Sequence, residues 1–171
     1  RVQEKTAGLK QKNEILSFLW QANRRLHMQV PLCERLSPVL NGLQNLTLLR
    51  DLELRVYDVE DEENHQEFTC QSDISCDDKG CHLCPRGLPP LTTSGTTLKW
   101  RLMDSHTQYG ILLATLPAGR HLSHDQQQLV DTLVEQLTAT LALDRHQEKQ
   151  QQLIVMEERA TIARELHDSI A

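Results

Sequence analysis

The C-terminal part of this sequence limits the fold most, because the stretch from Ser123 to the end contains neither proline nor glycine. These two residues are the usual breakers of helices, so we expect one long helix here. Ser123 suits the N-cap, and Asp125 in the first turn suits the positive end of the helix dipole. A helix of this length must place its apolar residues against a domain, a partner chain or both.

Two apolar stripes follow one another along this expected helix. The first suits packing on a sheet or on a partner, and the second has the alternating three- and four-residue spacing of a heptad repeat. The first consists of Val130, Leu133, Leu137 and Leu141, and the second of Leu153, Met156, Ala160, Ala163, His167 and Ile170. No alternation of three- and four-residue steps connects the two stripes, so we expect the seam to slip or rotate between them.

Another long helix is expected near the start, over residues 2–28, where good helix formers dominate. Residues suited to a coiled-coil seam recur there at heptad spacing. They are Val2, Leu9, Leu16 and Asn23, with Leu19 and Leu26 at the complementary position. The alternative is a single amphipathic helix that docks on the next domain, and the periodicity leaves both arrangements open.

Between these helices, the sequence has the pattern of a small α+β domain. Pro31 breaks the first helix, and an amphipathic helix is expected next, with Cys33 in the core. The predicted helix covers 32–49, and the predicted strands cover 52–57, 67–70, 96–102 and 109–116, the last of them central in its sheet. The acidic stretch 58–63 is expected to form a solvated hairpin loop.

The composition argues against several classes of function. Hydrophobic residues make up 39% of the chain and aromatic residues 4%, which suits a modest core rather than that of a large enzyme. The net charge of −6 argues against nucleic-acid binding, which normally shows a basic surplus. The sequence contains no run of about 18 apolar residues, which a membrane-spanning helix would need. No glycine-rich phosphate loop is present, so we expect no ATP site in this chain.

Four of the five cysteines lie in a loop over 70–95 that is rich in Pro, Gly, Asp and Ser. They are Cys70, Cys76, Cys81 and Cys84. Four thiolates this close together can form a closed tetrahedral zinc site, and part of their spacing matches plant-type iron–sulfur proteins. Redox-active thiols and plain loop cysteines are the alternatives. His65 and His82 are candidate additional ligands.

The most specific motif lies at the C-terminal end. Residues 158–168 read Glu-Arg-Ala-Thr-Ile-Ala-Arg-Glu-Leu-His-Asp, which resembles the phosphoacceptor box of sensor histidine kinases. Residues 16–49, the cysteine-rich insert and residues 150–159 extend this resemblance over essentially the whole chain. In these segments the sequence is similar to the nitrate/nitrite sensor kinases of two-component systems.

The resemblance implies that His167 is phosphorylated and that Asp168 assists as acid or base. Arg164 and Glu165 would then either recognise a partner or be ordinary surface residues of the helix. The chemistry suits these residue types, because an unprotonated imidazole is a nucleophile near neutral pH. Phosphoryl transfer also depends more on positioning and charge neutralisation than on covalent chemistry.

One conflict concerns the orientation of His167. The heptad spacing places this residue on the seam, whereas a phosphoacceptor must be exposed. We therefore expect a helical bundle to use the alternative face, formed by Ile162, Leu166 and Ser169.

The resemblance also implies the layout of a longer protein. Residues 1–30 would be a signalling helix after a HAMP relay, and 31–143 a GAF-like domain with a small antiparallel sheet. Residues 144–171 would begin the dimerisation and phosphoacceptor helix, so long coiled-coil signalling helices flank the domain at both ends. An external sensing domain and two membrane helices would precede this chain, and an ATP-binding domain would follow it.

The same resemblance implies partners and a location. The expected partners are a second copy of the chain and a response regulator, with ATP and Mg²⁺ bound elsewhere in the full-length kinase. The chain would be the cytoplasmic part of a bacterial inner-membrane protein and inactive alone. Two other functions stay open: a module that senses a metal, a redox signal or a small ligand, and a rigid spacer that only couples the two helices.

Overall fold

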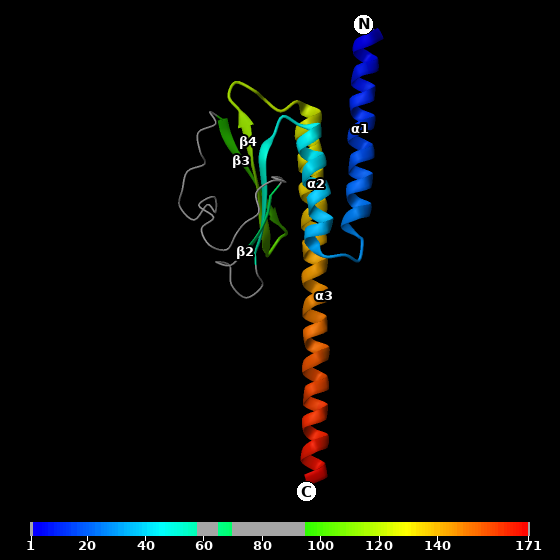
Figure 1. Ribbon diagram of the computed structural model, residues 1–171, viewed down its shortest axis with the longest axis vertical. Helices are drawn as coiled ribbons and strands as arrows, with labels where there is room; N and C mark the ends of the chain where they lie inside the picture. The colour runs from blue at the N-terminus through cyan, green and yellow to red at the C-terminus, as the bar shows by residue number, and fades with distance from the viewer. Residues whose placement is uncertain (1, 58–64, 70–94, 171) are drawn as a thin grey trace.

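A computed structural model of the chain describes residues 2–57, 65–69 and 95–170. The elements follow the order α1 (Val2–Leu26), α2 (Leu32–Leu46), β1 (Arg50–Tyr57), β2 (His65–Thr69), β3 (Gly95–Met103), β4 (Gln108–Pro117) and α3 (His124–Ile170). Figure 1 shows α2 and α3 beside the sheet, with α1 on the far side of these two helices and the chain ends at opposite ends of the molecule. The architecture is α+β, as predicted, and is consistent with a GAF-like module.

The four strands form one antiparallel sheet in the order β2-β1-β4-β3. β4 lies inside the sheet, as its mostly apolar sequence predicted. Leu112 of β4 pairs with Leu54 of β1 on one side and with Trp100 of β3 on the other. Gly110 lies where the β1 backbone comes so close that an added Cβ would be 2.3 Å from the Arg55 carbonyl oxygen. A larger residue there would force the two central strands apart.

The core lies between the sheet and the α2–α3 layer. The predicted apolar face of α2 and the first apolar stripe of α3 are buried there. Their fully enclosed members are Leu36, Val39, Leu40 and Leu43 of α2, and Val130, Leu133 and Leu137 of α3. Leu52, Leu54, Leu102 and Leu112 of the sheet pack in the same core. Burying this apolar surface is the main driving force that holds α3 to the domain.

Hydrogen bonds define the start of α3 and the end of α2. The Ser123 hydroxyl accepts a bond from the Gln126 amide at 3.2 Å, and the Gln126 side-chain oxygen accepts one from the Ser123 amide at 3.1 Å. This reciprocal pair is a capping box and confirms Ser123 as the N-cap. α2 ends three residues earlier than predicted, because Thr47 is extended and its hydroxyl donates to the Leu43 carbonyl.

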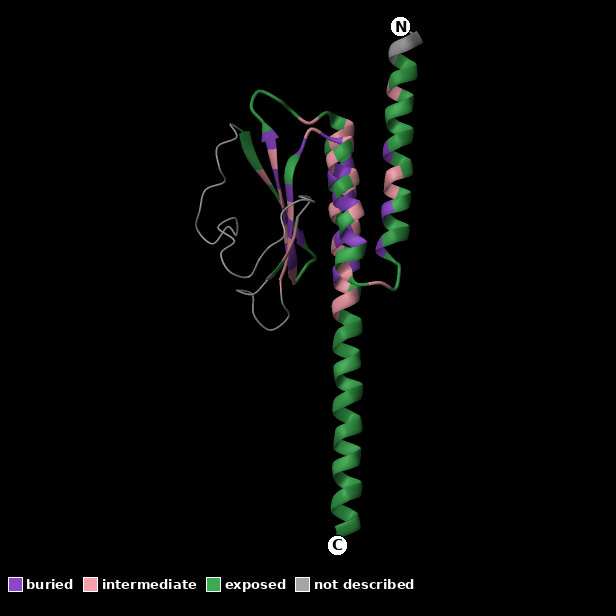
Figure 2. Cartoon of the chain, in the orientation of Figure 1, coloured by how far each residue is buried: buried purple, intermediate pink, exposed green. Residues whose placement is uncertain are grey.

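α1 docks on α2 and α3 through one face and leaves another face exposed (Figure 2). Ile15, Ala22 and Leu26 are buried in the core cluster, whereas Leu9 and Leu16 are 63% and 65% exposed. The docking that was the alternative to a coiled coil is therefore present within the chain. Leu26, which the heptad pattern assigned to a seam between chains, instead packs inside this one.

The prediction that Cys33 is a core residue is wrong, because Cys33 is exposed. It lies in the first turn of α2, at the flank of the face that buries Leu36 and Leu40. Among the described helices, none is long and apolar enough to cross a membrane.

Candidate phosphoacceptor site

The segment that carries the predicted site projects from the domain. Every described residue of α3 from 146 to 170 is exposed, and Figure 2 shows this part of the helix with no buried surface. The side chains of the second apolar stripe, such as Leu153 and Met156, therefore have no partner surface within the described part of the chain. Such a long apolar stripe on an exposed helix is typical of an interaction site.

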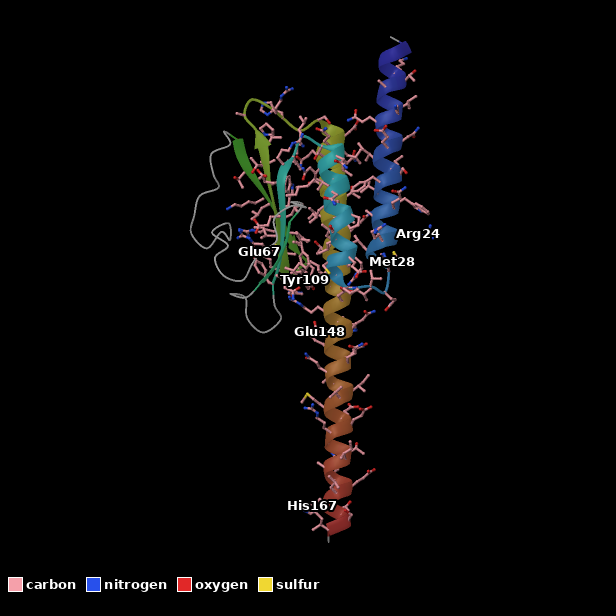
Figure 3. The ribbon with its side chains drawn as sticks, in the orientation of Figure 1. Arg24, Met28, Glu67, Tyr109, Glu148 and His167 are labelled. Atoms are coloured by element: carbon pink, nitrogen blue, oxygen red, sulfur yellow. The ribbon has the colours of Figure 1, made fainter. Side chains whose placement is uncertain are left out.

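His167 lies near the end of this helix, well beyond Glu148 and the sheet (Figure 3). The side chains of His167 and Asp168 are 88% and 87% exposed. The Nδ1 atom of His167 is 4.0 Å from Oδ1 of Asp168, which is longer than a hydrogen bond. The two groups can therefore form a hydrogen bond only after a small side-chain rotation, and the imidazole is open to an incoming reactant.

The two candidate faces of this segment are both exposed. His167, on the predicted seam, and Ile162 and Leu166, on the alternative face, are all accessible to solvent. Because both faces are exposed in the single chain, the face that a helical bundle would use stays a prediction. Arg164 and Glu165 also lie on the exposed helix surface.

A second group of polar residues lies where α3 leaves the domain. Asp144 accepts two hydrogen bonds from the guanidinium of Arg35 in α2, at 3.2 and 2.5 Å. The neighbouring residue, Arg145, donates to the Tyr57 carbonyl at the end of β1 over 2.9 Å. Its guanidinium also lies 5.0 Å from the centre of the Tyr109 ring, within the range of a cation–π contact. Consecutive residues thus fasten α3 to α2 and to the sheet.

The turn between β3 and β4 supports this group through Asp104. Its carboxylate accepts hydrogen bonds from the Tyr109 hydroxyl and from the amides of His106 and Thr107. The Tyr109 hydroxyl is the largest cause that lowers the pKa of Asp104 to about 2, and the two amides lower it further. The same hydrogen bond raises the pKa of Tyr109. Tyr109 is therefore held in place beneath Arg145.

This polar group was not predicted from the sequence, although the sequence carries one local signal of it. Arg35 interrupts the apolar face of α2 between Leu32 and Val39. A charged residue on such a face normally has a charged partner. The partner could not be identified from periodicity, since Asp144 is 109 residues away along the chain.

The predicted metal ligands lie outside the described residues. This applies to Cys70, Cys76, Cys81, Cys84 and His82, and to the side chain of His65; the acidic stretch 58–63 lies there too. Within 2–57, 65–69 and 95–170, no group of three or more His, Cys, Asp and Glu residues could hold a metal ion. Zinc or iron–sulfur binding at the cysteine loop therefore stays a prediction.

Comparison with known proteins tests the resemblance to nitrate/nitrite sensor proteins directly. No family model matches the chain. Over all 171 residues it is 87% identical to the nitrate/nitrite sensor protein NarX of Escherichia coli strain K12, and equally to that of Escherichia coli O157:H7 and of Shigella flexneri. The chain spans 29% of the length of these curated relatives. The predicted resemblance to nitrate/nitrite sensor proteins is thereby confirmed, and the chain is similar over its whole length to one segment of NarX.

Proposed function

We propose that this chain is the signal-relay segment of a two-component sensor histidine kinase that responds to nitrate or nitrite. In this role, it passes a signal from a membrane-bound sensing part to His167, where the phosphoryl group is attached. The observation that carries the proposal is the position of His167, exposed on a helix that leaves the domain at Asp144 and Arg145. The similarity to sensor proteins along the whole chain supports it.

The layout of the helices suits a relay. α1 and α3 run in the same direction, α1 packs beside α2 and α3, and the two helices end far apart (Figure 1). α1 packs on the segment of α3 that lies within the domain. The histidine lies roughly 35 Å beyond Asp144 at about 1.5 Å of rise per residue. A change at α1 can therefore reach a distant acceptor through one continuous helix.

The chemistry at His167 is nucleophilic attack on the terminal phosphorus of ATP. An unprotonated imidazole nitrogen forms the N–P bond while the bond from phosphorus to the oxygen of ADP breaks. Asp168 can take the proton from the other ring nitrogen, or hold it there so that the attacking nitrogen keeps its lone pair. Because Nδ1 is the atom nearest Asp168, we assign the attack to Nε2.

The remaining parts of the reaction belong to partners. ATP and Mg²⁺ would bind to a domain of the full-length protein that this chain does not include, and the phosphoryl group would pass from His167 to a response regulator. A second copy of the chain would cover Leu153 and Met156 and then, nearer the end of α3, the alternative face with Ile162 and Leu166, which gives α3 a partner surface and leaves His167 accessible. In this proposal the chain lies on the cytoplasmic side of a bacterial inner membrane.

The test is to map the phosphate in the full-length protein. Membranes that contain the protein would be incubated with ATP, and phosphohistidine would be located by mass spectrometry at neutral to basic pH. We expect phosphate on His167 and none in His167→Gln. The matched control is His146→Gln, which removes an exposed histidine from the same helix and should leave labelling unchanged. Labelling that survives in His167→Gln would refute the assignment.

A further inference from the structure

We infer that Arg35 is a positioning residue that couples the end of α1 to the rotational position of α3. It does so by binding the last residue of α1 and Asp144 of α3 at the same time. The inference rests on the proposed relay function, because a relay requires a route for the signal and Arg35 would form part of that route.

The first part of the argument is the set of contacts that Arg35 makes. Its Nη1 atom donates to the Leu26 carbonyl oxygen at 3.1 Å and to Oδ1 of Asp144 at 3.2 Å. Its Nη2 atom donates to Oδ2 of Asp144 at 2.5 Å. Leu26 is the last residue of α1, where a helix leaves carbonyl groups without partners inside the helix. One guanidinium therefore joins three helices: α2, which carries it, and the ends or exit points of α1 and α3.

The second part is that Arg35 is a poor choice for stability alone. The residue is 8% exposed, and its Nε atom is buried without a hydrogen-bond partner among the described residues. A buried donor without a partner is unfavourable. Its partner Asp144 is only partly buried, with 33% of the side chain exposed, and partly solvated ion pairs add little to stability. A planar, bidentate group is favoured where geometry between elements must be fixed.

The third part is the place of Asp144 on α3. Asp144 and Arg145 point about 100° apart around the helix axis, Asp144 toward Arg35 and Arg145 toward Tyr57 and Tyr109. Two contacts in different directions fix the rotation of α3 where it leaves the domain. Because no proline or glycine follows, the direction of His167 depends on that rotation.

These contacts define the route. A shift or rotation of the end of α1 moves the Leu26 carbonyl, and Arg35 cannot follow it and keep both bonds to Asp144. α3 must then rotate or Arg35 must release one partner. If α3 rotates, its exposed part turns relative to the domain; if Arg35 releases Asp144, α3 loses one of the two contacts that fix its rotation.

The test uses the full-length protein in lipid nanodiscs, with nitrate as the input. Hydrogen exchange of residues 146–166, measured by mass spectrometry with and without nitrate, reports the signal in α3, and exchange in β4 reports the stability of the domain. The variants are Arg35→Met, Asp144→Leu and the double variant. Arg55→Met is the matched control, because the Arg55–Glu53 pair, at 2.9 Å, lies within one strand.

We expect nitrate to change exchange in residues 146–166 of the wild-type protein. Arg35→Met should reduce that change by on the order of fivefold or more, whereas Arg55→Met should leave it intact. The double variant should keep wild-type protection in β4 and still lack the nitrate response in α3. Arg35→Lys, which keeps the charge but not the bidentate geometry, should retain part of the response.

Two results would overturn the inference. The first is a full nitrate response in Arg35→Met. The second is a response that returns in the double variant together with β4 protection, which indicates a structural role only. Failure of the proposed function is distinct, because it shows already in the wild-type protein: nitrate leaves exchange in 146–166 unchanged, or His167 receives no phosphate from ATP.

Discussion

The hydroxyl of Tyr109 donates a hydrogen bond to the Asp104 carboxylate over 2.5 Å, across the turn that joins β3 to β4. Both residues lie near the exit of α3, because the Tyr109 ring also contacts Arg145. The bond favours the ionised form of Asp104, whose pKa falls from 3.8 to about 2. At low pH, protonation of Asp104 would therefore weaken the contacts that hold Tyr109 against Arg145 of α3.

We expect the Asp104 turn to make stability depend on pH in the acidic range. Because the folded pKa is lower than the unfolded value, Asp104 contributes stability above pH 3.8, and the contribution is lost as pH falls toward about 2. In Tyr109→Phe, which keeps the ring but loses the hydroxyl, the pKa of Asp104 should rise toward 3.8. An NMR titration of the Asp104 carboxyl carbon measures this directly. An unchanged titration in Tyr109→Phe would contradict this account of the low pKa.

We expect two leucines of α3 to differ in their effect on folding. Leu133 is fully buried and Leu153 is 59% exposed. Leu133→Ala should lower the free energy of unfolding by about 2–5 kcal/mol, since it leaves a cavity in the core. Leu153→Ala should change it by less than about 0.5 kcal/mol at concentrations where the chain is monomeric. Denaturant unfolding measures both, and equal losses at all concentrations would mean that Leu153 packs within the chain.

Asp168 should control the rate of phosphorylation rather than its position. Asp168→Asn in the full-length protein keeps the size of the side chain but removes its ability to take a proton, so we expect autophosphorylation to slow by about 10²- to 10⁴-fold. The phosphate should still map to His167. Asp131→Asn is the matched control, because Asp131 is an exposed aspartate of the same helix. A wild-type rate in Asp168→Asn would remove Asp168 from the chemistry.

We expect the cysteine loop over 70–95 to bind a metal, because four thiolates lie close together in its sequence. The chain would be purified without oxygen, and its zinc, iron, acid-labile sulfide and visible spectrum would be measured. We expect about one zinc ion per chain or an iron–sulfur spectrum, lost when Cys70, Cys76, Cys81 and Cys84 are replaced by serine. Cys33→Ser, which changes an exposed cysteine of α2, should keep the metal. Absence of metal from the wild-type chain would leave reversible thiols or a plain loop.

Much of the fold could be predicted because local patterns reflect burial. The alternation of Leu52 and Leu54 with polar neighbours predicted β1, and the spacing of Leu133 and Leu137 predicted the buried stripe of α3. Boundaries were less certain, since the end of α2 depends on the backbone of Thr47 and its hydroxyl. Such geometry leaves little trace in hydrophobic periodicity.

Contacts between distant segments could not be predicted in this way. Cys33 fits the helical pattern of α2, but its burial depends on which neighbours lie at the flank of that helix, and there it is exposed. Leu26 fits a heptad equally well whether it faces another chain or the core of its own. The ion pair between Arg35 and Asp144 arises only when α2 and α3 pack side by side.

α3 runs unbroken from the domain to His167, so the number of residues between them determines the direction in which His167 points around the helix axis. Each residue inserted between Arg145 and His167 would turn the imidazole by about 100° around the helix, and seven would bring it back to within about 20° of its starting direction. Deletions act in the same way with the opposite sign. The number of residues in this segment therefore determines the direction in which His167 points. A single-residue insertion would point the histidine at a different neighbour, whereas a whole heptad would only move it farther from the domain.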